Sequence, residues 1–245
     1  ERHKNRMNRR LLITGAGGFL GSRICEYYSN RDGYEAVGVT HRELDIEDFV
    51  AVSAFIKAIR PDYVLHCAAI SNTGTCERNP VLSEKVNVRG TINLAKACRN
   101  AGSRMIFTSS DQIYNTSHSL EPNREGSEGK PGNVYGRDKK RAEEAMLTYL
   151  PDAVALRLTW MYDAPSRGRA AGQGLLQKLA DALKERREVE FPVHDYRGIT
   201  YVWEVVRHLE EAMGLPGGVY NFGSENRYNT FDTARLFLRE LAGSD

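Results

Sequence analysis

Two residues with complementary acid–base chemistry, Tyr135 and Lys139, lie four positions apart in a segment with a helical pattern. Residues at this spacing share one side of a helix, so the phenol and the ammonium are expected to face one site. A tyrosine ionises near pH ~10, and a nearby cation favours the phenolate and brings it toward a range useful for proton transfer. This spacing also occurs by chance as a surface pair, so it needs support from the rest of the chain.

That support comes from the end of a predicted strand upstream, which reads Thr108, Ser109, Ser110 and Asp111. The carboxyl ends of strands are where open α/β sheets bind ligands. The Ser110 hydroxyl could hold a carbonyl oxygen beside the phenol. Ser110, Tyr135 and Lys139 therefore predict hydride transfer, with Tyr135 donating or removing the alcohol proton.

A glycine-rich turn near the start of the chain indicates what delivers the hydride. Gly15, Gly18 and Gly21 are spaced three apart, directly after a predicted strand and at the start of a predicted helix. Such glycines allow a tight turn and close approach to a pyrophosphate, which the helix N-terminus attracts. A ligand-free turn can have the same spacing, but the strand–turn–helix context favours a Rossmann-type dinucleotide site.

Selectivity between the two nicotinamide dinucleotides is expected at the end of the second strand. An acid there binds the ribose hydroxyls, whereas a basic residue accepts a 2′-phosphate. The sequence has Arg42 and no acid before Glu43, which favours NADP. If Arg42 is only a surface residue, NAD is the alternative. Asp45 and Ile46 follow at a distance suited to an adenine pocket.

The elements that must position these groups alternate between short apolar strands and longer helical segments. The predicted strands are 10–14, 36–40, 63–67, 105–108 and 154–158, and the predicted helices are 18–29, 46–59, 81–101, 134–150 and 172–187. Continuously apolar strands indicate a parallel sheet covered on both faces. The alternation predicts an α/β fold of right-handed βαβ units, a Rossmann-type doubly wound parallel sheet.

The pattern is less regular after about residue 160. Loops are predicted at 115–132 and 163–172, strands at 189–191 and 218–222, and helices at 203–213 and 231–241. We predict an NAD(P)-binding Rossmann domain over residues 8–162. Residues 163–245 are expected to form mainly a small, discontinuous substrate-binding lobe, part of which could return to the sheet.

Composition excludes several classes of protein. With 34 basic and 32 acidic residues the net charge is +2, which does not favour binding to nucleic acid or to a membrane surface. The basic cluster within residues 2–10 is expected to be a solvated tail. No apolar stretch approaches the ~18 residues of a membrane span. The cysteines have no zinc-ligand spacing, so no metal site and a reducing, cytoplasmic setting are expected; they are Cys25, Cys67, Cys76 and Cys98.

Several stretches together resemble the extended short-chain dehydrogenase/reductases, and among them the dTDP-4-dehydrorhamnose reductases. The matching stretches are 14–21, 43–46, 60–64, 66–69, 86–95, 109–114, 133–139 and 156–162. The resemblance covers nearly the whole chain, most clearly residues 10–162. It implies a Rossmann domain with a small nucleotide-sugar lobe, and reduction of a 4-keto-6-deoxy sugar nucleotide by NADPH or NADH, as in dTDP-rhamnose biosynthesis.

The resemblance also implies roles for individual residues, with Ser110, Tyr135 and Lys139 as the catalytic set. The implied cofactor contacts are Gly15, Gly17, Gly18, Phe19, Leu20, Arg42, Asp45, Ile46, Cys67, Ala68, Ala69, Tyr135 and Lys139. The expected substrate contacts are Asp111, Gln112, Trp160 and Arg197. Arg197 could pair with a diphosphate or form a surface salt bridge. Asn87 matches a helix asparagine near the active site, or is an ordinary packing residue.

Departures from the family pattern lie on the substrate side. Ser110 stands where the family has threonine, Gln112 where it has tyrosine, and Tyr114 where it has phenylalanine. The chain also stops soon after Leu241, where family members continue. These departures leave room for a non-catalytic NADP-binding subunit like the methionine adenosyltransferase β subunit. A second alternative is an epimerase or dehydratase that retains NAD, which Arg42 and the missing acid disfavour. The resemblance leaves room for a homodimer.

Overall fold

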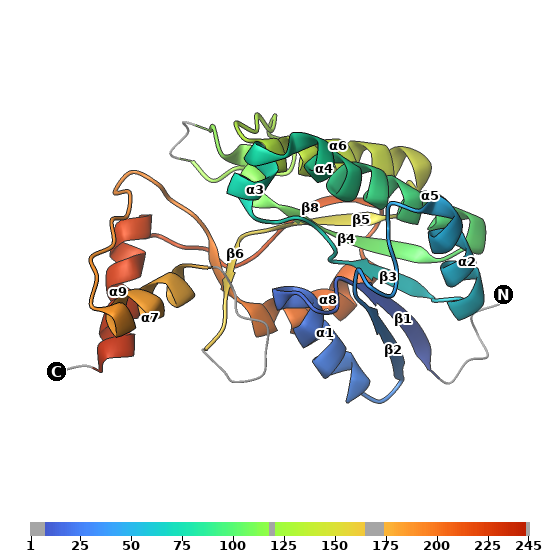
Figure 1. The fold of residues 1–245 in the computed structure, drawn as a ribbon, viewed down its shortest axis with the longest axis horizontal. Coiled ribbons are helices and arrows are strands. Elements are labelled where there is room, and N and C mark those ends of the chain that lie inside the picture. The colour runs from blue at the N-terminus through green and yellow to red at the C-terminus, as the bar shows by residue number, and fades with distance from the viewer. Residues whose placement is uncertain (1–7, 118–120, 165–173, 244–245) are drawn as a thin grey trace.

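A parallel six-stranded sheet in the order β2-β1-β3-β4-β5-β8 forms the centre of the computed structural model, which describes residues 8–117, 121–164 and 174–243 (Figure 1). The strands are β1 (Arg9–Thr14), β2 (Tyr34–Val39), β3 (Tyr63–His66), β4 (Arg104–Ser110), β5 (Val154–Leu158) and β8 (Gly218–Phe222). All five residues of β5 are buried, as expected for a strand covered on both faces. The predicted doubly wound α/β class is confirmed.

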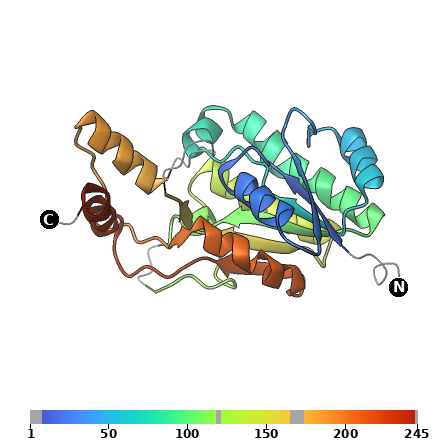
Figure 2. The ribbon, with the colours of Figure 1, turned by 90° about the horizontal axis from the view of Figure 1, so that it is seen from below.

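Helices cover both faces of this sheet (Figures 1 and 2). One layer contains α2 (Phe49–Ile59), α5 (Gly90–Ala101) and α6 (Val134–Tyr149), and the other contains α1 (Phe19–Ser29) and α8 (Val202–Gly214). Side chains along a strand alternate between the faces. Leu12 accordingly belongs to the core under α2, α5 and α6, whereas Leu11 and Ile13 belong to the core under α1 and α8.

The strand order reverses direction beside β1. The chain passes from β1 to β2 on one side and then returns to place β3 on the other side of β1. In open α/β sheets, the crevice outside the carboxyl ends of strands at such a reversal is where ligands bind. The ends of β1, β3 and β4 are therefore the edge that the functional residues have to reach.

The predicted helix 81–101 is a continuous helical run with a wide turn inside it. It consists of α4 (Pro80–Glu84), the π-helical segment η1 (Lys85–Arg89) and α5. Two short helical elements were not predicted, α3 (Thr73–Arg78) and the 3₁₀ turn η2 (Asp111–Tyr114). Both are too short to show a hydrophobic period.

A smaller lobe follows β5. It contains a parallel two-stranded sheet of β6 (Trp160–Tyr162) and β7 (Ile199–Tyr201), together with α7 (Leu175–Glu185) and α9 (Thr230–Ala242). The strand predicted at 189–191 is wrong, because that segment has no strand partner among the described residues. Its apolar residue Phe191 packs instead against the small core between α7 and α9.

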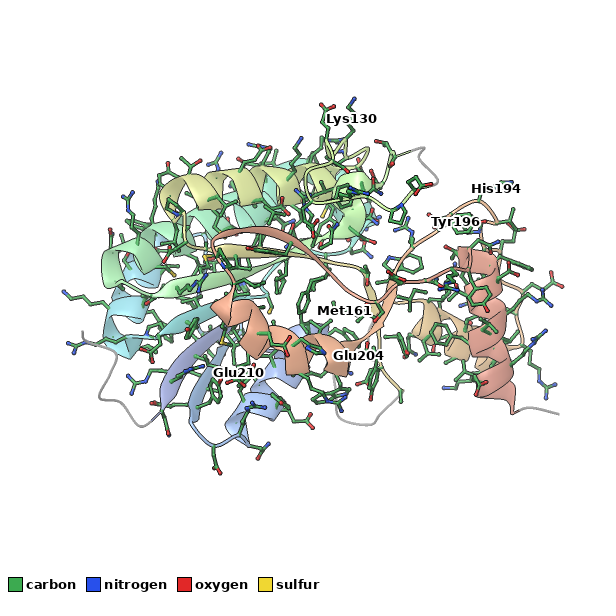
Figure 3. The ribbon with its side chains drawn as sticks, turned by 180° about the vertical axis from the view of Figure 1, so that it is seen from behind. Lys130, Met161, His194, Tyr196, Glu204 and Glu210 are labelled. Carbon is green, nitrogen blue, oxygen red and sulfur yellow. The ribbon has the colours of Figure 1, made fainter. Side chains whose placement is uncertain are left out.

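The lobe is not a continuous piece of chain, because α8 packs on α1 and β8 pairs with β5 in the main sheet. Figure 3 shows Met161 of β6 between the main sheet and the lobe. It also shows His194 and Tyr196 in the segment that leads to β7. The division at residues 162 and 163 stays a prediction. Most of the predicted loop 163–172, and residues 1–7 of the basic N-terminal segment, lie outside the described residues.

Substitution of Gly21 by alanine tests the packing of α1 on the glycine turn. A Cβ at Gly21 would lie 2.2 Å from the Gly15 carbonyl oxygen, so α1 would have to move. We expect Gly21→Ala to lower the free energy of unfolding by about 1–3 kcal/mol, as overpacked cores do. Urea denaturation followed by circular dichroism measures this loss.

Gly126→Ala is the matched control, because no atom lies within 4 Å of a Cβ built there. Equal urea midpoints for the two variants would show that α1 is not held against the turn.

Candidate active site

Tyr135 and Ser110 are brought together by the contact between α6 and the turn η2. Asn133 caps α6, and its side-chain oxygen accepts from the Gly136 amide at 2.7 Å. A Cβ at Gly136 would lie 2.5 Å from the Gln112 carbonyl oxygen, so only glycine allows the helix to begin this close to η2. The Tyr135 hydroxyl consequently lies beside the Ser110 side chain, which lowers the pKa of the phenol by hydrogen bonding.

Lys139 lies one helical turn further along α6 and is 2% exposed. Its Nζ donates to the Thr108 carbonyl oxygen at 2.8 Å and lies 4.5 Å from the centre of the Phe107 ring. The centre of the Tyr135 ring is 5.7 Å away. Burial lowers the pKa of Lys139 to about 8, although nearby acidic groups, among them Glu143, oppose this shift.

The pKa of Tyr135 moves in the direction opposite to the one expected from the sequence. Burial raises it above its ordinary value, the nearby Asp111 carboxylate raises it further, and the hydrogen bond with Ser110 only partly offsets these effects. Desolvation of the phenolate is the largest of these effects. At neutral pH Tyr135 is a protonated phenol, which can donate a proton.

Three of the four predicted substrate contacts gather where the sheet meets the lobe. Burial raises the pKa of Asp111 to about 6, and the Arg197 cation opposes this shift. The Arg197 guanidinium lies 4.7 Å from the centre of the Trp160 ring, and its Nε donates to Asp195 at 2.8 Å. Arg197 is thus half-buried at the seam, not a fully exposed surface residue.

Gln112 has a different environment. Its side-chain oxygen accepts from the Asn133 side chain at 2.8 Å and from the Asn115 side chain at 3.3 Å. Gln112 therefore connects η2 to the cap of α6 and to the start of the 115–132 loop. This contact was not visible from the sequence, where only its difference from the family tyrosine could be seen.

The glycine turn has the shape that a pyrophosphate requires. Gly15 has a φ of +71°, and a Cβ there would lie 2.7 Å from the Ala68 amide nitrogen. The turn is therefore in direct contact with Cys67 and Ala68, which follow β3. Gly18 is the N-cap of α1 and has no side chain to cover the first amides of the helix. These residues fit a dinucleotide, whose phosphates the exposed amides would bind.

A buried histidine that the sequence analysis missed holds this turn. His66 Nδ1 lies 2.8 Å from Thr14 Oγ1, and its Nε2 lies 3.0 Å from Thr91 Oγ1. Because Thr91 donates to the Asn87 carbonyl oxygen at 2.7 Å, Nε2 must carry the proton and Nδ1 must accept from Thr14. Burial, together with the Lys139 cation, lowers the pKa of His66 to about 3, so it stays neutral.

Asn87 in the π-helical segment fixes the loop that follows β3. Its side-chain oxygen accepts from the Ile70 amide at 2.9 Å and its side-chain nitrogen donates to the Ile70 carbonyl oxygen at 3.1 Å. The side-chain nitrogen also donates to Ser83, which in turn donates to Asp138 at 2.6 Å. Asn87 is therefore more than a packing residue, because it joins the predicted cofactor loop to α6.

The residues predicted to surround the adenosine separate into two kinds. Arg42 and Asp45 are exposed after β2, and no ion pair of Arg42 is found within the described ranges. Ile46 is buried, with its side chain against Gly90 of α5. Glu43 accepts from the Thr40 amide and hydroxyl at 2.7 and 2.9 Å, which fixes the turn that carries Arg42.

This arrangement matches a family of known proteins. The pattern that defines the RmlD substrate binding domain family matches residues 9–244. The chain belongs to this family. It is 31% identical to a dTDP-4-dehydrorhamnose reductase of Mycolicibacterium smegmatis, over 98% of this chain and 71% of that protein.

Two further proteins are similar to this chain. A methionine adenosyltransferase 2 subunit beta of Xenopus laevis is 31% identical, over 93% of this chain and 70% of that protein. The solved structure of a dTDP-4-dehydrorhamnose reductase from Bacillus anthracis in complex with NADP has a TM-score of 0.88, 24% identity, and coverage of 98% of this chain and 83% of that one.

Two other features bear on the classes considered from the sequence. In residues 8–117, 121–164 and 174–243, no group of acidic, histidine or cysteine side chains is arranged to hold a metal ion. The helices in these ranges also lack the combination of length and apolar character that a membrane crossing needs.

Replacement of Lys139 by methionine tests the cost of the buried ammonium. The folded-state pKa of about 8 lies below the ordinary value of 10.5, so the folded protein binds the proton less tightly than the unfolded chain. This costs stability below pH ~8, and the loss is recovered as pH rises toward ~10.5. We expect Lys139→Met to raise the free energy of unfolding at pH ~7 by up to about 3 kcal/mol, and therefore to raise the unfolding temperature.

Calorimetry from pH ~7 to ~10 measures the difference between variant and wild type, which should shrink above pH ~8. A difference that grew with pH would mean that Lys139 is stabilised as a cation.

Proposed function

We propose that the protein is an NADP-dependent oxidoreductase that reduces a 4-keto-6-deoxy nucleotide sugar, as dTDP-4-dehydrorhamnose reductases do. The observation that carries the proposal is the contact of Ser110 and Tyr135, with Lys139 beside them, at the carboxyl edge of a dinucleotide-type sheet. Family membership supports the same reaction.

The protonation state of Tyr135 suits reduction. The reduced nicotinamide supplies a hydride to the carbonyl carbon when the cofactor is bound. Tyr135, as a protonated phenol, donates its proton to the carbonyl oxygen, which becomes a hydroxyl, and solvent later restores the proton. Ser110 orients the phenol and the carbonyl oxygen, and Lys139 provides a positive charge beside the phenolate that remains.

The substrate side is proposed to involve the seam between the sheet and the lobe. Arg197 would pair with the diphosphate of the nucleotide sugar, in competition with Asp195, and its guanidinium rests on Trp160. Asp111 would contact the sugar near the reacting carbon. Gln112 is proposed to act indirectly, through the cap of α6.

The similarity to the Xenopus protein supports a second candidate function, that of an NADP-binding regulatory subunit without turnover.

The described cysteines are all free thiols, which supports a reducing, cytoplasmic setting. A homodimer stays a prediction.

Turnover separates the two candidates. Purified protein should oxidise NADPH in the presence of dTDP-4-dehydrorhamnose, measured as the loss of absorbance of the reduced nicotinamide. Tyr135→Phe removes the proton donor, so kcat should fall by a factor of about 10²–10⁴ with little change in NADPH binding. Binding of NADPH without turnover of any 4-keto nucleotide sugar would favour the regulatory subunit.

Arg42 provides the test of cofactor selectivity. If its guanidinium binds the 2′-phosphate, Arg42→Ala should raise the Kd for NADPH at least about tenfold and leave that for NADH nearly unchanged, since one charge-assisted contact contributes about 1.5–3 kcal/mol. Isothermal titration with both dinucleotides measures the ratio. Arg60→Ala, another arginine of the same domain but at the end of α2, is the control. Equal losses for both dinucleotides would remove Arg42 from the 2′-phosphate site.

A further inference from the structure

A buried ion pair joins β5 to the helix that carries Tyr135 and Lys139. Arg157 of β5 is 8% exposed at its side chain and Glu143 of α6 is 2% exposed. The Arg157 Nη2 donates to Glu143 at 2.7 Å, and its Nε lies 3.1 and 3.3 Å from the two carboxylate oxygens. Such a two-pronged pair is well defined in geometry and in charge.

The remaining donor of Arg157 holds the loop that follows η2. Its Nη1 donates to the Tyr114 hydroxyl and, at 3.3 Å, to the Glu125 carbonyl oxygen. The Tyr114 hydroxyl also lies 3.0 Å from the Asn221 side-chain oxygen of β8. Each side-chain nitrogen of Arg157 therefore donates at least one hydrogen bond, and Glu143 has a fixed partner.

Glu143 follows Lys139 by four positions in α6, so the two side chains share one face of the helix. The carboxylate acts on the ammonium in the direction that favours its charged form. Between Tyr135 and Arg157, the same face of α6 thus carries a phenol, an ammonium and a carboxylate in sequence. The electrostatic potential that this part of α6 produces at the Lys139 ammonium depends on how completely Arg157 neutralises Glu143.

Other groups face Lys139 from the elements packed against it. They are His66 and Cys67 from β3 and its end, Cys76 from α3, and Asp138 from α6. His66 is neutral, and burial raises the pKa of the Cys67 thiol to about 12 and also raises that of Cys76. Asp138 accepts a hydrogen bond from Ser83 and lies within 3.9 Å of Arg141. Of the two carboxylates near Lys139 in the described part of the chain, Asp138 and Glu143, only Glu143 has a buried ion-pair partner.

We propose that Arg157 is a positioning residue for the reaction: by pairing with Glu143 it sets the charge that Lys139 experiences beside Tyr135. The role of this charge in turnover rests on the proposed reductase function, whereas its effect on Lys139 does not. Arg157 does not touch the reacting atoms in this arrangement; it acts on them through the charge balance of its pair with Glu143 and through the ammonium of Lys139.

Two substitutions that break the same pair should have opposite effects. Arg157→Met leaves an unbalanced carboxylate, which raises the pKa of Lys139, whereas Glu143→Gln leaves an unbalanced guanidinium, which lowers it. Residues four apart on a helix have Cβ atoms about 5–6 Å apart. At an effective dielectric constant of about 40, between that of a protein surface and that of water, one charge at this separation shifts a pKa by about one unit. Loss of structure alone would move both variants in the same direction.

The shift can be measured without substrate by NMR titration of protein labelled with ¹³C at lysine Cε, with the Lys139→Arg variant to identify the signal. We expect an upward shift for Arg157→Met, a downward shift for Glu143→Gln, and a near wild-type value for the double variant. Arg157→Lys keeps the charge and should also stay near wild type. Glu144→Gln, one residue along but exposed on the outer face of α6, is the matched control.

The double variant and Arg157→Lys keep the inference testable if a single variant fails to fold, because each retains charge balance at this position. A shift of about one unit in either would overturn the inference, as would shifts of the same sign in Arg157→Met and Glu143→Gln. In the reductase assay, the alkaline limb of kcat/KM should follow the NMR shifts. Absence of turnover with opposite NMR shifts would reject the proposed function and leave the inference standing.

Discussion

The ammonium of Lys139 sits beneath the carboxyl edge of the sheet, almost without contact to water. A cation in such a place is costly unless oxygen atoms and aromatic faces replace its hydration. The Thr108 carbonyl oxygen and the Phe107 ring do this in part at the end of β4, and the lowered pKa of Lys139 shows the cost that is left. The position of α6 over β4 follows from this requirement, and Tyr135, one turn earlier, is carried to Ser110 as a result.

The same requirement explains the polar groups that surround this edge. His66 can serve as a rigid connector between β1 and α5 because the neighbouring cation and its own burial keep it neutral. The carboxylate of Glu143 is tolerated because Arg157 balances it. The edge is therefore a set of mutually dependent charges, in which a change at one group alters the protonation of the others.

The sequence predicted those parts of the site that depend on local spacing. The glycine turn, and the pair Tyr135 and Lys139, are recognisable because a turn and one helical face fix their geometry. The pairing of Arg157 with Glu143 and the contacts of His66 depend on tertiary packing. A charged residue inside the apolar run of β5 was nevertheless a signal of a buried partner, and Glu143 at the next helical turn after Lys139 was the candidate.

The lobe was harder to predict for a physical reason. Its core is small, centred on Leu175, Leu179 and Ala234, and its sheet has two strands, so its sequence shows little period. A short segment such as 189–191 can then look like a strand in the sequence, although in the structure it packs on helices without regular secondary structure. In contrast, β8 pairs with the main sheet and α8 packs against that sheet, and both show clear patterns.

The protonation state of Tyr135 follows from burial and from the charges near it. If the Lys139 cation dominated, Tyr135 would be partly ionised at neutral pH and better suited to remove a proton from an alcohol. Burial dominates instead, and the nearby Asp111 carboxylate acts in the same sense. The phenol therefore keeps its proton until a carbonyl oxygen gains negative charge beside it, and only then does Lys139 stabilise the phenolate. An edge built in this way holds at neutral pH the proton that reduction of a ketone requires.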